Sequence, residues 1–208
     1  MVAAMTAAAT TARALTVLIH PLFGAGVDLD DISLAGSEPS VSLSLQGVSR
    51  HPEVAELVAE LVGVWAGTGE GQYPTIDSFR YREMTAFTER PDHPALHFDQ
   101  RTWKQTPDGE TVSHWETGLL RISSDGTVRL HDAQPGRVEA MAGTWARQGP
   151  GWEISLGSVG YAGDDRVAAT ARTFYLVTGE LTYEMLMETT STGELSLHLS
   201  ARLQRNRT

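Results

Sequence analysis

The chain has 208 residues, 41% of them hydrophobic, with no cysteine and a formal net charge of −10. This length and composition predict one globular domain with a sizeable core, and the lack of cysteine excludes disulfides, thiolate metal sites and cysteine nucleophiles. Nucleic acid is a poor partner for so acidic a chain, and no basic run offsets the charge locally.

The first 50 residues differ from the rest in composition. They begin with an Ala/Thr-rich run over residues 3–12 and continue through Gly- and Ser-rich segments, without a helical period or a bounded pair of strands. We expect residues 1–50 to be a disordered extension and residues 51–208 to form the folded domain.

Signals for membrane insertion and export are weak. The most apolar stretch, residues 14–19, is ended by His20 and Pro21, far short of the roughly 20 residues that a membrane-spanning helix needs. No Lys or Arg precedes Arg13 and no clear cleavage site follows, which disfavours a signal peptide. The sequence therefore predicts no membrane contact and a cytoplasmic location.

One short helix is predicted after the extension. Pro52 suits the first helical position, and Gly63 is able to end the helix. Apolar residues repeat with helical spacing between these two points, at Val54, Leu57, Val58, Leu61 and Val62. This pattern predicts a helix of about three turns with one apolar face, suited to capping one end of the fold.

Everything after Gly63 alternates with period two and is punctuated by turn residues such as Pro107-Asp108-Gly109. Ten strands are predicted, at about 64–71, 77–88, 96–105, 112–123, 127–133, 138–147, 152–159, 167–177, 181–190 and 195–205. The short connections favour antiparallel hairpins, and closure removes both sheet edges. We therefore predict an all-β fold, a ten-stranded antiparallel up-and-down barrel. Side chains do not easily fill so wide a barrel, which favours binding of a small ligand.

Three glycines alternate along the first predicted strand, at Gly67, Gly69 and Gly71, and therefore share one face. They indicate either a bulky group close to the backbone, a ligand or a crossing chain, or a structural bend at a barrel corner. A phosphate-binding loop is excluded, because the spacing is not G-x-G-x-x-G and Pro74 stands where a helix would begin.

The seven histidines form no close metal-binding pair, and no G-x-S-x-G motif is present. His198 lies in the last predicted strand, where the odd positions 195–203 are apolar and the even positions are polar. In one interpretation the leucines face inward and His198 faces water. In the other, His198 faces a cavity between the small neighbours Ser196 and Ser200. Periodicity alone leaves both open.

The second interpretation has a consequence for association. If His198 points inward, an apolar stripe faces outward, formed by Leu195, Leu197, Leu199 and Leu203. An exposed stripe of this kind is usually covered, most often by a two-fold partner, so this interpretation predicts a homodimer.

The run from Gly63 through Trp65, Gly67 and Gly69 to Ile76 resembles the G-x-W-x-G-x-G-x-G-x-Y-P-T-I signature of the nitrobindin family. Further segments agree in order: Phe79-x-Tyr81-x-Glu83, Gln100-x-Thr102, His114-x-Glu116-x-Gly118 and His198-Leu-x-Ala201-x-Leu203-x-Arg205. Together these segments span about residues 53–205.

This resemblance implies a calycin-like barrel that binds haem b, one per subunit, and isomerises peroxynitrite to nitrate, with nitric oxide as a further ligand. It implies that His198 is the axial ligand of the haem iron and the catalytic residue. It also implies that Thr75 lies at the haem edge and His114 near the pocket. The lysine that the family often carries before the eighth strand has no clear counterpart, and Arg166 is the nearest cation.

Two departures from the family pattern are His97-Phe98, where tyrosine is common, and Leu119, which replaces a frequent tyrosine. Trp65 is expected to close the barrel end through a cation–π contact with Arg202 or Arg205.

Two other functions stay open. A fatty-acid or other hydrophobic-ligand carrier would share the barrel and use an interior arginine and tyrosine, and a structural domain would need no cofactor.

Overall fold

The computed structural model describes residues 51–90 and 93–206, and the predicted extension over residues 1–50 lies outside them. One helix, α1 (Pro52–Leu61), precedes ten strands. The strands are β1 (Gly63–Tyr73), β2 (Ile76–Arg90), β3 (His93–Thr106), β4 (Gly109–Ile122), β5 (Thr127–Gln134), β6 (Arg137–Gln148), β7 (Gly151–Ala162), β8 (Val167–Val177), β9 (Glu180–Thr189) and β10 (Ser196–Arg205). The predicted helix and all ten predicted strands are present, so the all-β prediction is confirmed.

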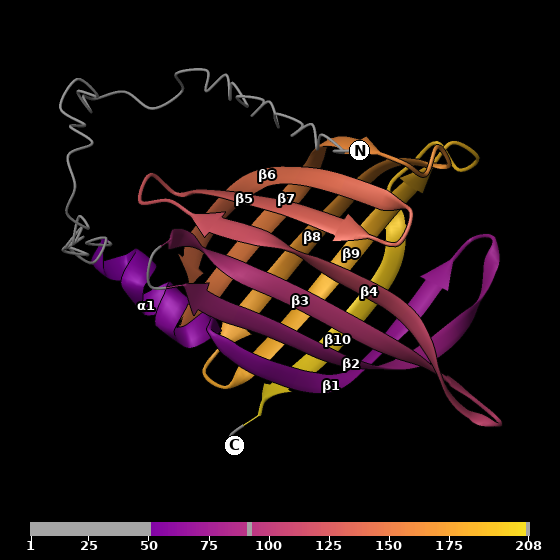
Figure 1. Ribbon diagram of the computed structural model, residues 1–208, viewed down its shortest axis with the longest axis horizontal. Coiled ribbons are helices and arrows are strands. Elements are labelled where there is room, and N and C mark those ends of the chain that lie inside the picture. The colour runs from indigo at the N-terminus through magenta and orange to yellow at the C-terminus, as the bar shows by residue number, and fades with distance from the viewer. Residues whose placement is uncertain (1–50, 91–92, 207–208) are drawn as a thin grey trace, which may run out of the picture. The chain divides into compact units, whose positions relative to one another are not determined.

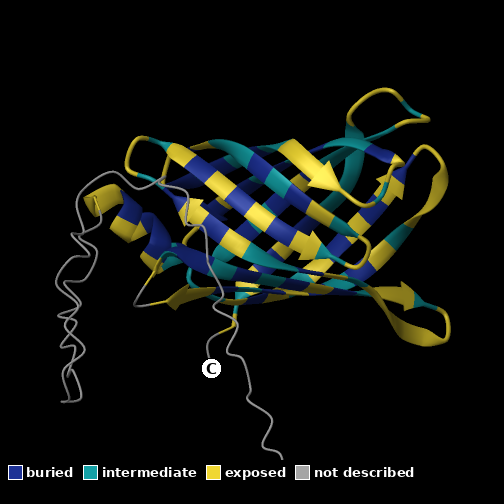
Figure 2. Cartoon of the chain, turned by 45° about the horizontal axis from the view of Figure 1, so that its top comes forward, coloured by how far each residue is buried: buried dark blue, intermediate teal, exposed yellow. Residues whose placement is uncertain are grey.

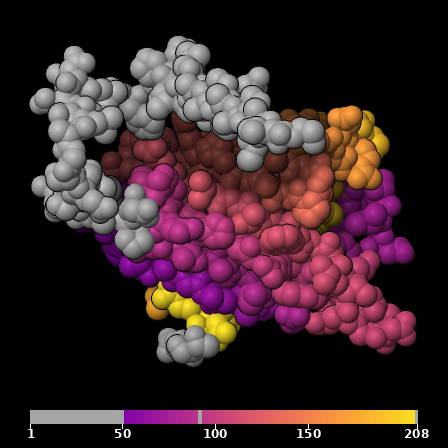
Figure 3. Space-filling view, viewed as in Figure 1, coloured from indigo at the N-terminus to yellow at the C-terminus, as the bar shows by residue number. Residues whose placement is uncertain are grey.

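The strands form a closed barrel in which each pairs antiparallel with its sequence neighbours and β10 returns to pair with β1 (Figure 1). Buried and exposed residues alternate along the strands, as the period of two predicts (Figure 2). The hairpin that joins β3 to β4 extends beyond the barrel rim (Figures 1 and 3). Among the described residues, no helix is long and apolar enough to cross a membrane.

One end of the barrel is closed by α1, whose buried face consists of Val54, Leu57, Val58 and Leu61. The side chain of Trp65 is fully buried below the helix and donates a hydrogen bond from Nε1 to the Leu61 carbonyl at 2.9 Å. Arg205 completes this end, because its guanidinium donates to the carbonyls of Ala59 and Val62, at 3.1 and 2.7 Å. These are carbonyls that the helix itself leaves unpaired.

The expected cation–π contact with Trp65 belongs to Arg205, whose Cζ lies 5.2 Å from the indole centroid. The side chain of Arg202 is instead 73% exposed and lies near Glu180 on the outer wall. The last strand therefore holds the helix and the first strand together at the closed end.

The glycines of β1 make room for protein groups. A Cβ at Gly67 would collide with the backbone of β10 at Arg202, while one at Gly69 would overlap the ring of Tyr81 and one at Gly71 the ring of Phe79. Gly63 has a φ of 146°, which suits glycine, at the junction between helix and strand. The groups close to the backbone are therefore the paired strand β10 at Gly67 and aromatic rings of β2 at Gly69 and Gly71, and no crossing chain is involved at these three glycines.

Candidate functional site

The end of the barrel opposite α1 contains a cavity of about 630 Å³, within the usual range for small-ligand sites. Its wall comes from the turns of that end and from the inner faces of β1 to β4 and of β8 to β10. The four predicted cofactor residues, Thr75, His114, Arg166 and His198, all line it. Apolar side chains line it as well: Phe79, Val167, Met185, Met187 and Leu199.

His198 reaches the cavity through a β-bulge. Leu197 pairs with Leu186 of β9, but Leu199 pairs with the next residue toward the chain start, Met185, so one extra residue is inserted at His198. A shift of one residue exchanges the two faces of a strand. Leu199, Ala201 and Leu203 therefore face inward, and His198 joins them at the cavity wall.

The two interpretations of the last strand were thus each half right. The predicted outward stripe does not form, because Leu203 is fully buried and Leu199 packs against the core. Leu195 is 45% exposed and Leu197 partly exposed. A homodimer predicted from the stripe therefore loses its structural argument, although association itself stays a prediction.

The imidazole of His198 is held in one orientation. Its Nδ1 lies 3.2 Å from the carbonyl oxygen of Gln72, an acceptor only, so Nδ1 carries the hydrogen. The edge of the ring packs against Tyr73, with centroids 5.5 Å apart. Nε2 then keeps its lone pair, which is the state that an axial metal ligand requires.

Electrostatics favour the neutral form of this imidazole. Burial lowers the pKa of His198, and the nearby His114 and Arg137 lower it further, against the opposing effect of the Gln72 hydrogen bond. A neutral imidazole is the form that donates electrons to a metal.

Thr75 lies in the turn between β1 and β2, where its side chain is exposed at the cavity rim. Arg166 lies before β8, and its side chain is 85% exposed. Its guanidinium forms two hydrogen bonds with Asp164, both at 2.8 Å, which lower the pKa of Asp164 to about 2. Arg166 is therefore already paired with a carboxylate in this structure.

His114 belongs to a buried charged network on β4 and β8. Its Nε2 lies 3.2 Å from Oε2 of Glu116, and the Glu116 carboxylate accepts hydrogen bonds from both terminal nitrogens of Arg172. Burial alone would raise the pKa of Glu116, but Arg172 and the His114 hydrogen bond outweigh it, so this pKa lies well below its usual range. Because Glu116 is ionised, its carboxylate accepts a hydrogen bond from Nε2 of His114 and so fixes the orientation of that ring.

Two further cavity residues were missed by the sequence reasoning. Tyr73 follows the glycine run, and its hydroxyl contacts Oγ1 of Thr192 at 2.8 Å, which ties β1 to the β9–β10 turn. Arg137 begins β6 with a side chain only 9% exposed; one nitrogen binds Glu139 at 3.3 Å, and its Nε has no partner. The turn Gln134-Pro135-Gly136 places Arg137 at the start of a strand, at one end of the barrel. The order of the strands was therefore the sequence signal that could have placed Arg137 near the cavity.

A second unsatisfied group is Asp132 on β5. It is 5% exposed, its Oδ1 has no partner, and its Oδ2 has only a 3.5 Å contact with Gln134. Burial, followed by the charge of Glu116, raises the pKa of Asp132 to about 7. The barrel interior on this side therefore carries charged groups with incomplete pairing.

Comparisons with known proteins identify the family of this chain. The sequence model of the family described as THAP4-like, heme-binding beta-barrel domain matches residues 55–205. A protein of Arabidopsis thaliana named peroxynitrite isomerase Rv2717c is 38% identical over 156 residues, covering 74% of this chain and 90% of that protein. Peroxynitrite isomerase 2 of Mycobacterium ulcerans is 37% identical, covering 74% and 96%. The crystal structure of Rv2717c from M. tuberculosis superposes with a TM-score of 0.68 at 31% identity, covering 76% of this chain and 100% of that one.

Proposed function

Because this chain belongs to the THAP4-like, haem-binding β-barrel family, which includes the nitrobindins, we propose that it binds one haem b in the cavity through His198 and isomerises peroxynitrite to nitrate. The observation that supports this most is the His198 imidazole, which is fixed through Nδ1 by Gln72 and therefore keeps Nε2 free. The curated relatives of similar length carry the name peroxynitrite isomerase, which supports the same activity here.

The residues around the cavity fit a haem. His198 offers the single nitrogen that the iron needs, and the apolar wall of Phe79, Met185 and Leu199 suits a flat macrocycle. Two cations, Arg137 and Arg166, line the same cavity. Each already contacts a carboxylate, Glu139 and Asp164 respectively, so the two carboxylates of the cofactor would share these cations or displace their partners. When bound, the haem supplies a ferric iron at which the peroxynitrite O–O bond is rearranged.

The remaining residues have supporting roles in this proposal. Gln72 keeps the proton of the neutral imidazole on Nδ1 of His198, so that Nε2 carries the lone pair. Glu116 holds the ring of His114 at the cavity wall, where it shapes the pocket without binding the metal. Thr75 offers a hydroxyl at the rim for the haem edge. Nitric oxide is a second small ligand that the bound haem would accept.

The carrier alternative depends on an interior arginine and tyrosine. The barrel has both, in Arg172 and Tyr183, but the guanidinium of Arg172 already pairs with the buried Glu116 through both terminal nitrogens. A fatty-acid carboxylate would have to displace this partner and leave a buried charge unpaired, which is costly. This observation favours the haem protein over the carrier.

Two features of the cellular context belong to the proposal as well: a cytoplasmic location and a homodimer. Cell fractionation tests the first. Sedimentation at tens of micromolar tests the second, and a strict monomer would exclude the dimer.

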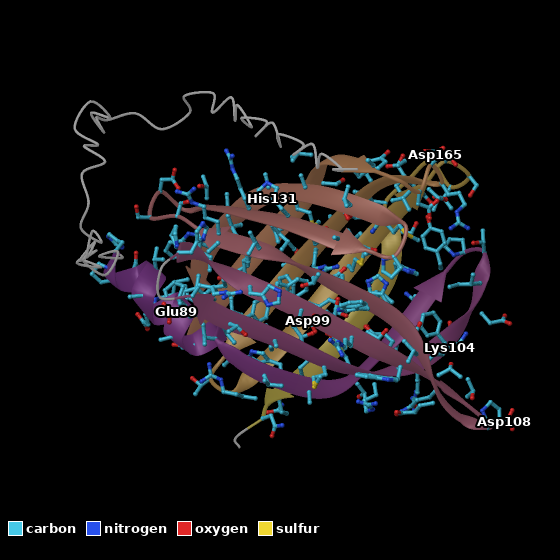
Figure 4. All side chains as sticks on the ribbon, in the orientation of Figure 1. Glu89, Asp99, Lys104, Asp108, His131 and Asp165 are labelled. Carbon is cyan, nitrogen blue, oxygen red and sulfur yellow. The ribbon has the colours of Figure 1, made fainter. Side chains whose placement is uncertain are left out.

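The test of the function pairs haem titration with stopped-flow peroxynitrite decay. His198→Ala should weaken haem binding about a hundredfold and reduce decay to the protein-free rate, because it removes the nitrogen that this proposal assigns to the iron. The matched control is His131→Ala, since His131 is exposed on the outer face of β5 (Figure 4). Wild-type affinity and rate in His198→Ala would refute the assignment.

A further inference from the structure

The barrel interior contains a chain of hydrogen bonds that the proposed function does not use. It begins at Glu83 on β2, which is fully buried, and passes to Tyr183 on β9, with Oε2 and the hydroxyl 2.7 Å apart. The Tyr183 hydroxyl lies 3.0 Å from that of Tyr81, and Tyr81 lies 3.2 Å from the Ser200 carbonyl oxygen. Ser200 is two residues beyond His198 on β10.

Counting hydrogens links the ionisation of Glu83 to the Tyr81–Ser200 contact. The three contacts of this chain need three hydrogens, but the two tyrosine hydroxyls supply only two, and the Ser200 carbonyl supplies none. All three bonds form only if Glu83 contributes the third hydrogen from a protonated carboxyl group. The chain then has one direction, in which Glu83 donates to Tyr183, Tyr183 to Tyr81, and Tyr81 to Ser200.

The other contacts of Glu83 agree with this count. Its Oε1 accepts from Thr85 and from the Gln100 amide, each at 2.6 Å, so only Oε2 is left to carry the hydrogen. Gln100 also donates to the Tyr183 hydroxyl at 3.0 Å, which saturates that oxygen. Burial raises the pKa of Glu83, against the opposing effects of its hydrogen bonds and of Arg172.

Gly69 of the first motif opens the path for this chain. A Cβ at Gly69 would overlap both the Tyr81 ring and the Ser200 carbonyl oxygen. The absence of a side chain therefore brings the Tyr81 hydroxyl within reach of β10. This contact lies close to the bulge that turns His198 into the cavity.

We propose that Glu83 is a neutral carboxylic acid that anchors the Glu83–Tyr183–Tyr81–Ser200 chain, and that this chain positions the β10 segment carrying His198. Glu83 is a positioning residue, because it acts through the two tyrosines and Ser200. Tyr81 also lines the cavity, so its positioning role is tested by the His198 resonances of the haem-free protein rather than by haem affinity. The effect on haem binding rests on the proposed function, whereas the ionisation of Glu83 and the orientation of His198 are measurable without haem.

The first test is infrared spectroscopy of the haem-free full-length protein well above pH 7, where Asp132, with its pKa of about 7, is ionised. Wild type should show the carbonyl band of a protonated carboxylic acid, and Glu83→Gln should lose it. Asp132→Asn should retain the band. A wild-type spectrum without that band would overturn the proposal.

The second test compares Glu83→Gln, Tyr81→Phe and the control Tyr175→Phe, an exposed tyrosine of β8. The glutamine amide keeps one acceptor and one donor in the places of the neutral acid, so Glu83→Gln should bind haem within about threefold of wild type. Tyr81→Phe should weaken haem binding about tenfold and shift the ring nitrogen resonances of His198 in the haem-free protein. Tyr175→Phe should change neither.

Two outcomes would contradict the positioning role. One is a Tyr81→Phe protein with wild-type His198 resonances. The other is a Glu83→Gln protein with shifted His198 resonances and weakened haem binding, which is the result expected if Glu83 is ionised in the wild type. Tyr183→Phe, which removes the middle hydroxyl of the chain and leaves β10 itself unchanged, should reproduce the His198 shift and serves if Tyr81→Phe folds poorly. If wild type fails to bind haem, the proposed function fails, while the infrared and resonance measurements still decide the proposal about Glu83.

Discussion

The two ends of the barrel are built in opposite ways. At the closed end, the buried Trp65 has its one polar atom bonded, and Arg205 caps the last carbonyls of α1. At the open end, Arg137 and Asp132 are buried with an atom left unpaired, and a β-bulge interrupts the strand at His198. Buried polar atoms without a partner occur at both ends, since Oε2 of Glu60 and Nε of Arg205 also lack one. The ends differ instead in that the open end has the cavity and an irregular strand, which are typical of functional sites. Stability and ligand binding are therefore separated along the barrel axis.

The largest effect that separates the two ends is expected from Trp65→Ala. Removing this fully buried indole should lower the free energy of unfolding by about 3–5 kcal/mol. Haem affinity of the folded protein should stay within about twofold, because Trp65 lies at the other end. Denaturant unfolding and haem titration measure the two quantities, and a large loss of haem affinity in folded protein would show that the ends are coupled.

Arg205→Met sharpens the comparison at the closed end. The variant keeps an apolar stem but leaves helix carbonyls without their donor, which should cost about 1–3 kcal/mol of unfolding free energy. The matched control is Arg202→Met on the same strand, whose exposed side chain makes one 3.8 Å ion pair and should contribute under about 0.5 kcal/mol. Equal effects in thermal unfolding of the two variants would contradict the capping role.

The pH dependence of the unfolding free energy measures the cost of ionising the buried Asp132 in the folded protein. Its folded-state pKa of about 7 exceeds its unfolded value of about 3.9. Between these values the folded state binds more protons, so stability should fall as pH rises from about 4 through 7, by up to about 1.4 kcal/mol per pH unit. Asp132→Asn should remove this slope and be more stable than wild type at pH 8. Parallel stability profiles for the two proteins between pH 5 and 8 would contradict this account.

The smallest effect is expected at the rim. Thr75→Val removes one exposed hydroxyl from the cavity wall and should weaken haem binding only about threefold to tenfold, without changing Tm. Thr88→Val, on an exposed position of β2, is the control and should change neither. A hundredfold loss in Thr75→Val would make the rim as important as His198.

The same contrast explains what the sequence predicts well. Much of the closed end follows from local rules: apolar spacing predicts α1 from Pro52, and alternation predicts the strands. The arginine that contacts Trp65 was left open between Arg202 and Arg205, and the structure selects Arg205. His198 and Thr75 were identified through the family resemblance, which carries information that periodicity lacks.

The open end escaped those rules for physical reasons. Strand alternation assumes an unbroken ladder, so it placed Leu203 and His198 on opposite faces, and a one-residue bulge made both face inward. Arg137 looks like an ordinary surface residue beside a turn, because burial of its side chain depends on strands far away in the sequence. The hydrogen count at Glu83 needs three strands at once and has no local signature.

The most direct test of the account is imidazole rescue of His198→Gly, followed through the Soret band of bound haem. Wild type should bind haem in a histidine-ligated form, His198→Gly should lose that form, and added imidazole should restore it by filling the space that the side chain leaves. His114→Gly should keep the wild-type band without imidazole. The account would be contradicted if His198→Gly kept the wild-type band and affinity while His114→Gly lost them and was rescued by imidazole.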